Sequence, residues 1–180
     1  MNKQKILDVA EDYIRRGGYS SFTLADIAER LKLSSETMMK SIGSKEALVG
    51  IVAQRYADRF FEALGDVDGF RKRTAKEAIQ HYCSAYHTAY TASGMACLCG
   101  VLASEAHVLD TNTRSIISRF VALNVRWLET ALSFDGSCLN PVDAHQRAMM
   151  IYCSMEGAMR VATLKKSEDW ILEVADVVMP

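Results

Sequence analysis

Apolar residues recur every three or four positions along most of the chain, and this spacing predicts amphipathic α-helices. Residues 3–16 and 45–64 show the pattern most clearly, and Gly17 and Gly18 mark the end of the first stretch. The same reasoning predicts further helices at about residues 24–31, 35–41, 71–92, 95–107, 112–133, 142–165 and 168–178. The alternating, β-branched pattern of strands is hard to find. We therefore expect an all-α fold.

Residues 22–48 predict two short helices joined by a tight turn and followed at once by the start of a third. Thr23 suits the N-cap of the first helix, and Asp26 stands three positions later, as in a capping box. Ser34 caps the second helix, and Ser44 caps the third after a glycine. This layout is typical of a helix-turn-helix that reads DNA.

Two loop segments suggest how the chain is organised: GDVDG at residues 65–69 and FDGSCLNP at residues 134–141. We predict a helix-turn-helix DNA-binding domain at residues 1–48, a connecting helix and linker at 49–66, and a helical ligand-binding and dimerisation domain at 67–180. Such a division, with a DNA-binding head and a sensing body, is typical of a regulator.

The composition narrows the class of protein. With 180 residues, 49% of them hydrophobic, the chain can bury a real core. Its amino end alternates charged and apolar residues, unlike a signal peptide, and no apolar run approaches the roughly 18 residues of a membrane helix. The five cysteines are an odd number without framework spacing, which favours a reducing compartment. We expect a cytoplasmic protein that makes no membrane contact.

The charge excludes a generally basic, unspecific nucleic-acid binder, because the formal net charge is −1. Residues 1–55 hold nine Lys/Arg against seven Asp/Glu, so the head is only slightly basic. Residues 141–180 hold four Lys/Arg against six Asp/Glu. Contacts with phosphates would therefore come from individually placed residues rather than from a strong field.

An enzyme finds little support in the sequence. There is no glycine-rich phosphate loop and no paired metal-ligand motif. The four histidines, which are His81, His87, His107 and His145, have no convincing nucleophile partner. We expect no catalytic residue, no cofactor and no metal.

A set of fixed offsets across about 45 residues at the amino end carries a family resemblance. The matching residues are Gly18, Tyr19, Thr23, Asp26, Ile27, Ala28, Leu33, Ser34, Thr37 and the run from Ser44 to Leu48. With these residues the chain resembles the TetR family of bacterial transcriptional regulators. The resemblance implies a homodimer that binds a palindromic DNA operator, acts as a repressor and is released by a small-molecule inducer. Further along, residues 97–106 look like the middle of many family bodies.

The resemblance also implies which residues meet DNA. The short helix at residues 34–42 would enter the major groove, and Thr23 and Lys45 would meet phosphates at helix amino ends. The alternative is that Thr23 is an ordinary cap and Lys45 is solvated. The expected DNA-binding residues are Thr23, Ser35, Glu36, Thr37, Met39, Lys40, Ser41 and Lys45. Among them Ser35, Glu36, Met39 and Lys40 are the base-facing candidates.

The reading helix departs from the family pattern at several positions. The family commonly has Tyr and His or a similar group where this chain has Met39 and Ser41, Phe where it has Ile42, and Gly where it has Lys32. Met39 cannot donate a hydrogen bond to a phosphate. Glu36 adds a negative charge that either accepts from cytosine N4 or repels the backbone. The alternative function is therefore a TetR-like protein that has lost DNA binding and acts through protein partners.

Two wing helices, residues 142–165 and 168–178, would build the dimer if the chain follows the family. Small residues permit close helix approach, and paired across a two-fold axis the helices would form a four-helix bundle. The expected interface residues are Met149, Cys153, Gly157, Ala158, Met159 and Ala162. The alternative is that these residues are monomer core. Dimerisation would place two reading helices about 34 Å apart, one turn of DNA.

A ligand cavity would lie among the helices at residues 71–92, 95–107 and 112–133, closed by 142–165. The candidate ligand-binding residues are Tyr82, Tyr86, Tyr90, Cys97, Phe120, Trp127, Met150 and Tyr152. Ring faces with hydroxyl or indole tips suit an apolar molecule with a few polar groups. Ordinary core packing is the alternative for each of them.

The pair Cys97 and Cys99 has three interpretations. Both are small buried hydrophobes, or they sense electrophiles or oxidants, or together with His107 they bind a metal. Thiol sensing needs a lowered pKa, and no Lys or Arg lies close in sequence. Metal binding is the weakest of the three, because a spacing of two on a helix points the side chains about 200° apart.

Overall fold

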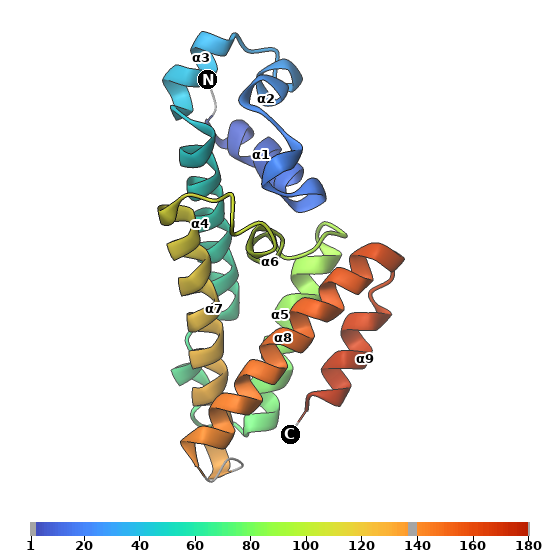
Figure 1. Cartoon of the computed structure of the whole chain (residues 1–180). Helices are drawn as coiled ribbons and strands as arrows, with labels where there is room; N and C mark the ends of the chain where they lie inside the picture. The colour runs from blue at the N-terminus through green and yellow to red at the C-terminus, as the bar shows by residue number, and fades with distance from the viewer. Residues whose placement is uncertain (1–2, 137–139, 180) are drawn as a thin grey trace. The chain divides into compact units, whose positions relative to one another are not determined.

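The computed structural model describes residues 3–136 and 140–179, and every regular element within these ranges is helical (Figure 1). The all-α prediction is confirmed. The α-helices are α1 (Lys3–Gly17), α2 (Leu24–Arg30), α3 (Ser35–Ile42), α4 (Lys45–Leu64), α5 (Ala75–Thr91), α6 (Leu98–Ala103), α7 (Thr111–Leu132), α8 (Pro141–Lys165) and α9 (Asp169–Val177). Short 3-10 turns are η1 (Tyr19–Ser21), η2 (Val67–Phe70) and η3 (Phe134–Gly136). Within the described ranges, none of the helices has the length and apolar character needed to cross a membrane.

Two predicted helices are longer than the helices in the structure. The stretch 71–92 becomes helical only at Ala75, because Thr74 and Glu77 form a capping box that sets the start of α5. The prediction of one helix over 95–107 is wrong: only Leu98–Ala103 is helical, and tight turns follow. Ala96 and Cys97, just before α6, are buried in a segment without regular structure, so their apolar character reflects burial rather than a helix. Part of the predicted loop at 134–141, including Cys138, lies outside the described residues.

The chain forms two compact units by its internal contacts. Unit 1 comprises Met1–Asp58 and Leu98–Ser118, and unit 2 comprises Arg59–Cys97 and Arg119–Pro180. The boundaries fall inside α4 and α7, so each of these helices contributes to both units. Residues 98–118 pack with the amino-terminal residues, which the linear division of the sequence did not include.

In unit 1 the carboxylate of Glu105 holds the end of the first helix. It accepts hydrogen bonds from the backbone N–H groups of Tyr19 and Ser20, the latter at 3.3 Å. Gly18 adopts a φ of +84°, and a Cβ at this position would overlap with the Glu105 carboxylate. A glycine is therefore required twice, once for the backbone conformation and once for the space. Glu105 thus fastens the segment after α6 to the residues that lead into α2.

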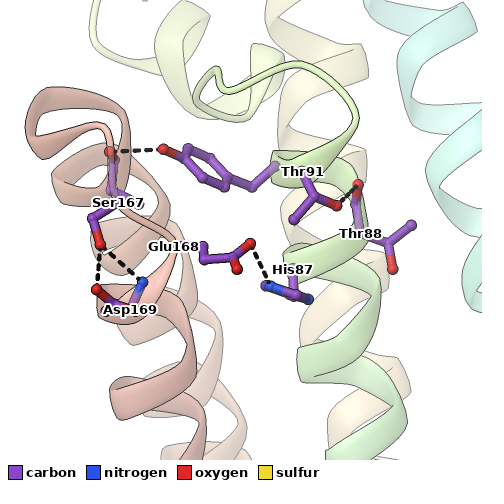
Figure 2. Close-up of polar contacts among 8 residues, drawn as sticks. His87, Thr88, Thr91, Ser167, Glu168 and Asp169 are labelled. Carbon is purple, nitrogen blue, oxygen red and sulfur yellow. Dashed lines mark hydrogen bonds and ion pairs between the residues drawn. The ribbon is translucent and has the colours of Figure 1, made fainter.

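In unit 2 the chain reverses direction between α8 and α9, and the two helices run side by side (Figure 1). Lys166 ends α8 in the left-handed conformation at φ +54°. Figure 2 shows how α9 is joined to α5: His87 lies 3.0 Å from the Glu168 carboxylate, while Ser167 donates to Asp169 at 2.6 Å. Ile171 on α9 is fully buried. The contacts fix the junction between the last two helices against α5.

Candidate functional site

A capping box closes the start of α2. The Thr23 hydroxyl accepts from Asp26 N at 3.3 Å, while the Asp26 carboxylate accepts from Thr23 N at 2.6 Å and from the Thr23 hydroxyl at 2.8 Å. These bonds hold the pKa of Asp26 below its ordinary value, and the Thr23 hydroxyl is the largest cause. A carboxylate therefore already occupies the helix end that a DNA phosphate would use. Thr23 is a cap in this structure, and its phosphate contact stays a prediction.

The turn between α2 and α3 depends on a lysine in the left-handed conformation. Lys32 has a φ of +53°, which allows Leu33 N to donate to Ala28 O at 2.8 Å. Ser34 then caps α3 by accepting from Thr37 N at 3.2 Å. Glycine adopts this backbone conformation without strain, whereas lysine does not. The departure from the family at Lys32 is therefore a local strain at the turn.

Helix α3 separates its apolar and polar residues between two faces. Met38 and Ile42 are buried in unit 1, at 1% and 8% exposure. The four base-facing candidates, which are Ser35, Glu36, Met39 and Lys40, are all exposed. Thr37 and Ser41 are half-buried, and the Ser41 hydroxyl donates to Thr37 O at 2.7 Å. The structure thus brings the four candidates together on one exposed surface, while Thr37 and Ser41 are partly covered.

On this exposed surface Glu36 and Lys40 pair with each other. Lys40 Nζ lies 2.6 Å from Glu36 Oε1, with both side chains about three-quarters exposed at 75% and 76%. Such a pair on a helix surface contributes little to stability. It does neutralise the one cation of the reading surface, so DNA must compete with Glu36 for Lys40.

Lys45, the second expected phosphate contact, is folded against the head. Its Nζ donates to Phe22 O and lies 4.3 Å from the ring centroid of Tyr19 and 4.5 Å from that of Phe22. Partial burial lowers the pKa of Lys45, although nearby carboxylates oppose this effect. The aromatic partners were not foreseen, since they lie more than twenty positions earlier in the chain. The contact of Lys45 with phosphate stays a prediction.

Seven of the eight ligand candidates are buried in unit 2, and three of them are joined by ring contacts. The ring centroids of Tyr82 and Tyr86 are 5.4 Å apart, and Tyr82 lies 5.6 Å from Trp127. The ring centroid of Phe60, a residue that the sequence analysis did not include, lies 5.3 Å from that of Tyr86 and 5.4 Å from that of Phe120. The exception is Met150, whose side chain is 52% exposed and therefore lies apart from this cluster.

The buried hydroxyls have partners that the sequence did not reveal. Tyr82 Oη donates to Asn124 Oδ1 at 2.7 Å, and Tyr86 Oη donates to Glu156 Oε1 at 2.9 Å. Burial raises the pKa of both tyrosines well above its ordinary value. One signal was available for Glu156: it is the only charged residue between Arg147 and Arg160. An acid inside an apolar helical stretch indicates a specific partner.

Cys97 and Cys99 were expected on one continuous helix, and the structure places only one of them on a helix. Cys97 precedes α6 and Cys99 belongs to it, and both thiols are buried and outside any disulfide. The Cys97 thiol donates to the Glu156 carboxylate. A carboxylate next to a thiol disfavours the thiolate that redox sensing requires. Burial also raises the pKa of Cys83, to about 12.

Comparison with known proteins identifies the head. Residues 6–50 match the model of bacterial regulatory proteins of the tetR family. The whole fold is similar to the crystal structure of a TetR transcriptional regulator from Legionella pneumophila, with 27% identity, a TM-score of 0.87, and coverage of 99% of this chain and 95% of that one. The head therefore matches the tetR family, and the whole chain has the fold of a TetR transcriptional regulator.

Two structures of lower sequence identity show the same fold as this chain. A TetR-family transcriptional regulator from Agrobacterium tumefaciens shares 22% identity, with a TM-score of 0.79 and coverage of 97% and 93% of the two chains. The regulator FadR from Bacillus subtilis, in complex with stearoyl-CoA, shares 16% identity, with a TM-score of 0.76 and coverage of 99% and 98%. No curated protein matches the chain significantly.

The predicted dimer residues divide between the surface and the core of unit 2. Met149, Cys153 and Gly157 are exposed along one side of α8, at helical spacing, and a Cβ added at Gly157 would meet no neighbouring side chain within 4 Å. Ala158, Met159 and Ala162 are buried within unit 2, as the alternative of monomer core expected. Further apolar residues exposed on α8 and α9 are Val142, Met150, Leu164, Trp170, Leu172 and Val177.

Trp127 connects the ring cluster to a hollow on unit 2. Its indole N–H donates to Gly65 O at 3.0 Å, and the ring lines an open hollow of about 390 Å³. The other lining residues are Phe61, Gly65, Asp66, Val67, Leu123, Arg126 and Thr130. This volume suits a small molecule. Of the ligand candidates, Trp127 alone lines this hollow.

Proposed function

We propose that this TetR-family protein is a homodimeric, ligand-responsive transcriptional repressor that binds a palindromic operator through α3 and is released by a small-molecule inducer. The observation that carries the proposal is the exposed surface of α3, where Ser35, Glu36, Met39 and Lys40 lie together. The helix is anchored from behind by Met38 and Ile42. A major groove admits such a helix, and its side chains meet base edges there.

The homodimer is supported by the exposed apolar residues of α8 and α9. Met149 and Met150 are 42% and 52% exposed, and Leu164 is 78% exposed. Apolar residues gathered on one face of a chain indicate an interaction surface. A second copy packed on α8 and α9 would cover them, with Cys153 and Gly157 near the centre of the contact.

A route from ligand to DNA is supported by chain continuity. Both α4 and α7 contribute residues to unit 1 and to unit 2, and Glu105 fastens the segment after α6 to Tyr19 and Ser20. A ligand that shifts these elements in unit 2 changes the strain on the head. It releases DNA only if it binds the two arrangements of the heads with different affinity. An inducer of unknown identity, bound among Tyr82, Tyr86 and their neighbours, would act in this way.

Thiol sensing receives less support than an inducer. The Cys97 thiol contacts a carboxylate, and the Cys83 thiol has its pKa raised to about 12 by burial. Neither environment favours a reactive thiolate. The loss of DNA binding remains the alternative that an experiment must decide, because Met39 is exposed where the family has a hydrogen-bonding aromatic residue.

The test is selection of bound duplexes from a randomised DNA pool by the purified protein, followed by a salt titration of the winner. We expect an enriched palindrome whose affinity falls steeply with salt. Lys40→Ala should weaken binding roughly five- to ten-fold and reduce the salt slope by about 1. The matched control is Lys76→Ala, which removes an exposed lysine from α5 and should change neither quantity. A folded dimer that enriches no sequence even at low salt would instead support action through protein partners.

A further inference from the structure

A chain of buried polar groups crosses the interior of unit 2. It starts at Asn124 on α7, whose Nδ2 donates to Phe120 O at 2.8 Å and whose Oδ1 accepts from Tyr82. Next to Tyr82, Tyr86 donates to Glu156 on α8. Buried polar networks are favourable only when each member finds its partners. The chain of contacts is complete at Asn124 and incomplete at Glu156.

The incomplete atom is Glu156 Oε2. Glu156 is 9% exposed, and within the described residues its Oε2 is buried and has no hydrogen-bond partner. Buried polar atoms in folded proteins nearly always have partners, so an exception needs an explanation. A ligand that donates to Oε2 supplies one.

The surroundings of Glu156 specify what that ligand must be. The carboxylate faces the hydroxyl of Tyr86 and the thiol of Cys97, and the positive charge of Arg160 also acts on it. The ring centroids of Phe60 and Tyr82 lie 5.3 Å and 5.4 Å from that of Tyr86. Aromatic faces attract cations, and an anionic oxygen attracts a cationic N–H donor. An anionic ligand group would meet repulsion at the same position.

We propose that Glu156 is the recognition group for an organic cation, whose N–H pairs with Oε2 while its apolar body packs against the rings of Tyr82, Tyr86 and Phe120. The proposal rests on the proposed function, since it names the chemical class of the inducer. The rings are tightly packed, with Tyr82 and Tyr86 at 0% and 1% exposure. A ligand that enters must therefore move α5 relative to α8, which is how binding would favour one arrangement over another.

The test compares three probes that share one body and differ in charge: 4-phenylbutylammonium, 4-phenylbutanol and 4-phenylbutyrate. Binding to the full chain is measured by titration calorimetry without DNA. We expect the ammonium to bind about ten-fold more tightly than the alcohol, as a charge-assisted hydrogen bond predicts. The acid should bind more weakly than the alcohol. Equal binding of the three, no binding of the ammonium up to about millimolar concentration, or a preference for the acid would each overturn the proposal.

The variant Glu156→Gln keeps the shape of the side chain and removes its charge. It should bring the ammonium to the affinity of the alcohol, a loss of about ten-fold. The matched control Glu173→Gln, on the exposed side of α9, should keep the wild-type preference. Circular dichroism checks that both variants fold. If Glu156→Gln does not fold, the preference among the probes in the wild-type protein decides alone.

Failure of this proposal is distinguishable from failure of the proposed function. A selected operator together with no preference for the ammonium would retain the repressor and overturn the cationic ligand. A clear preference for the ammonium together with no selected DNA would retain the ligand site and overturn the repressor.

Discussion

Helices α3 and α8 use their carboxylates in opposite ways. On α3, Glu36 pairs with Lys40 four positions away, in solvent, with about three-quarters of each side chain exposed (75% and 76%). On α8, Glu156 is 9% exposed and accepts from Tyr86, seventy positions earlier in the chain. The first pair follows from helical spacing alone. The second exists only because α5 and α8 pack together.

On α3 the residues proposed for function are separate from those that stabilise the fold, whereas in unit 2 the same residues serve both. The reading surface of α3 contributes little to the core, so its polar residues are free to meet DNA. The polar residues of unit 2 are part of the core, so a ligand that binds them must alter the packing. A regulator needs both kinds of site, and the following changes test whether the division holds.

The largest effect is expected where backbone and packing requirements coincide. Gly18→Ala should lower the free energy of unfolding by about 3 kcal/mol, because it combines a left-handed φ with an overlap at Glu105. The matched control is Gly43→Ala, which has a similar φ of +85° and nothing within 4 Å. It should lose only about 1 kcal/mol. Urea unfolding measures both, and equal losses would show that the Glu105 contact is unimportant.

The buried carboxylate of α8 should respond to pH. Burial is the largest influence on the pKa of Glu156 and raises it above the ordinary value of 4.5, although bonds from Cys97 and Tyr86 oppose the rise. A raised pKa in the folded state gives stability below pH 4.5 that is lost as pH rises through the raised value. Glu156→Gln has no carboxyl group to titrate and does not lose this stability. Between pH 4 and pH 8, its free energy of unfolding should therefore rise by roughly 1 kcal/mol relative to that of the wild type.

Thermal and urea unfolding of the wild type and Glu156→Gln across this pH range give the difference directly. The exposed substitution Glu36→Gln serves as the control and should show a flat difference. A flat difference for Glu156→Gln as well would mean that the carboxylate is solvated in the folded protein.

The cap of α3 should have a moderate effect. Ser34→Ala removes the acceptor for Thr37 N and should lower stability by about 1 kcal/mol. Ser35→Ala, one position later on the exposed surface, should change stability by less than about 0.5 kcal/mol. If Ser35 contacts a base, Ser35→Ala should lower DNA affinity more than Ser34→Ala does, which is the reverse of their order in stability. Unfolding curves and operator titrations separate the two roles.

The smallest expected effect on stability belongs to the exposed pair on α3. Glu36→Gln should change the free energy of unfolding by less than about 0.5 kcal/mol. It frees Lys40 and removes a negative charge, so we expect DNA affinity to rise about three-fold at low salt. If affinity falls instead, Glu36 itself reads the DNA, as a carboxylate does at cytosine N4.

Local signals account for what the sequence predicted correctly. The capping residues Thr23 and Ser34 act within three positions of themselves, so the starts of α2 and α3 could be placed from spacing. The region around α6 was misjudged, because the apolar residues just before α6 are buried without forming a helix. The positions of the predicted DNA, ligand and dimer residues are now described, and their roles remain predictions.

The amino-acid order alone specified the all-α class, the helix-turn-helix and the family, because each of these depends on residues a few positions apart. Only the tertiary structure revealed that Glu105 holds the backbone at Tyr19, that Lys45 rests on Phe22, and that Glu156 meets Tyr86. These contacts join residues more than twenty positions apart. Their formation depends on how helices pack against one another, which no local spacing in the chain encodes.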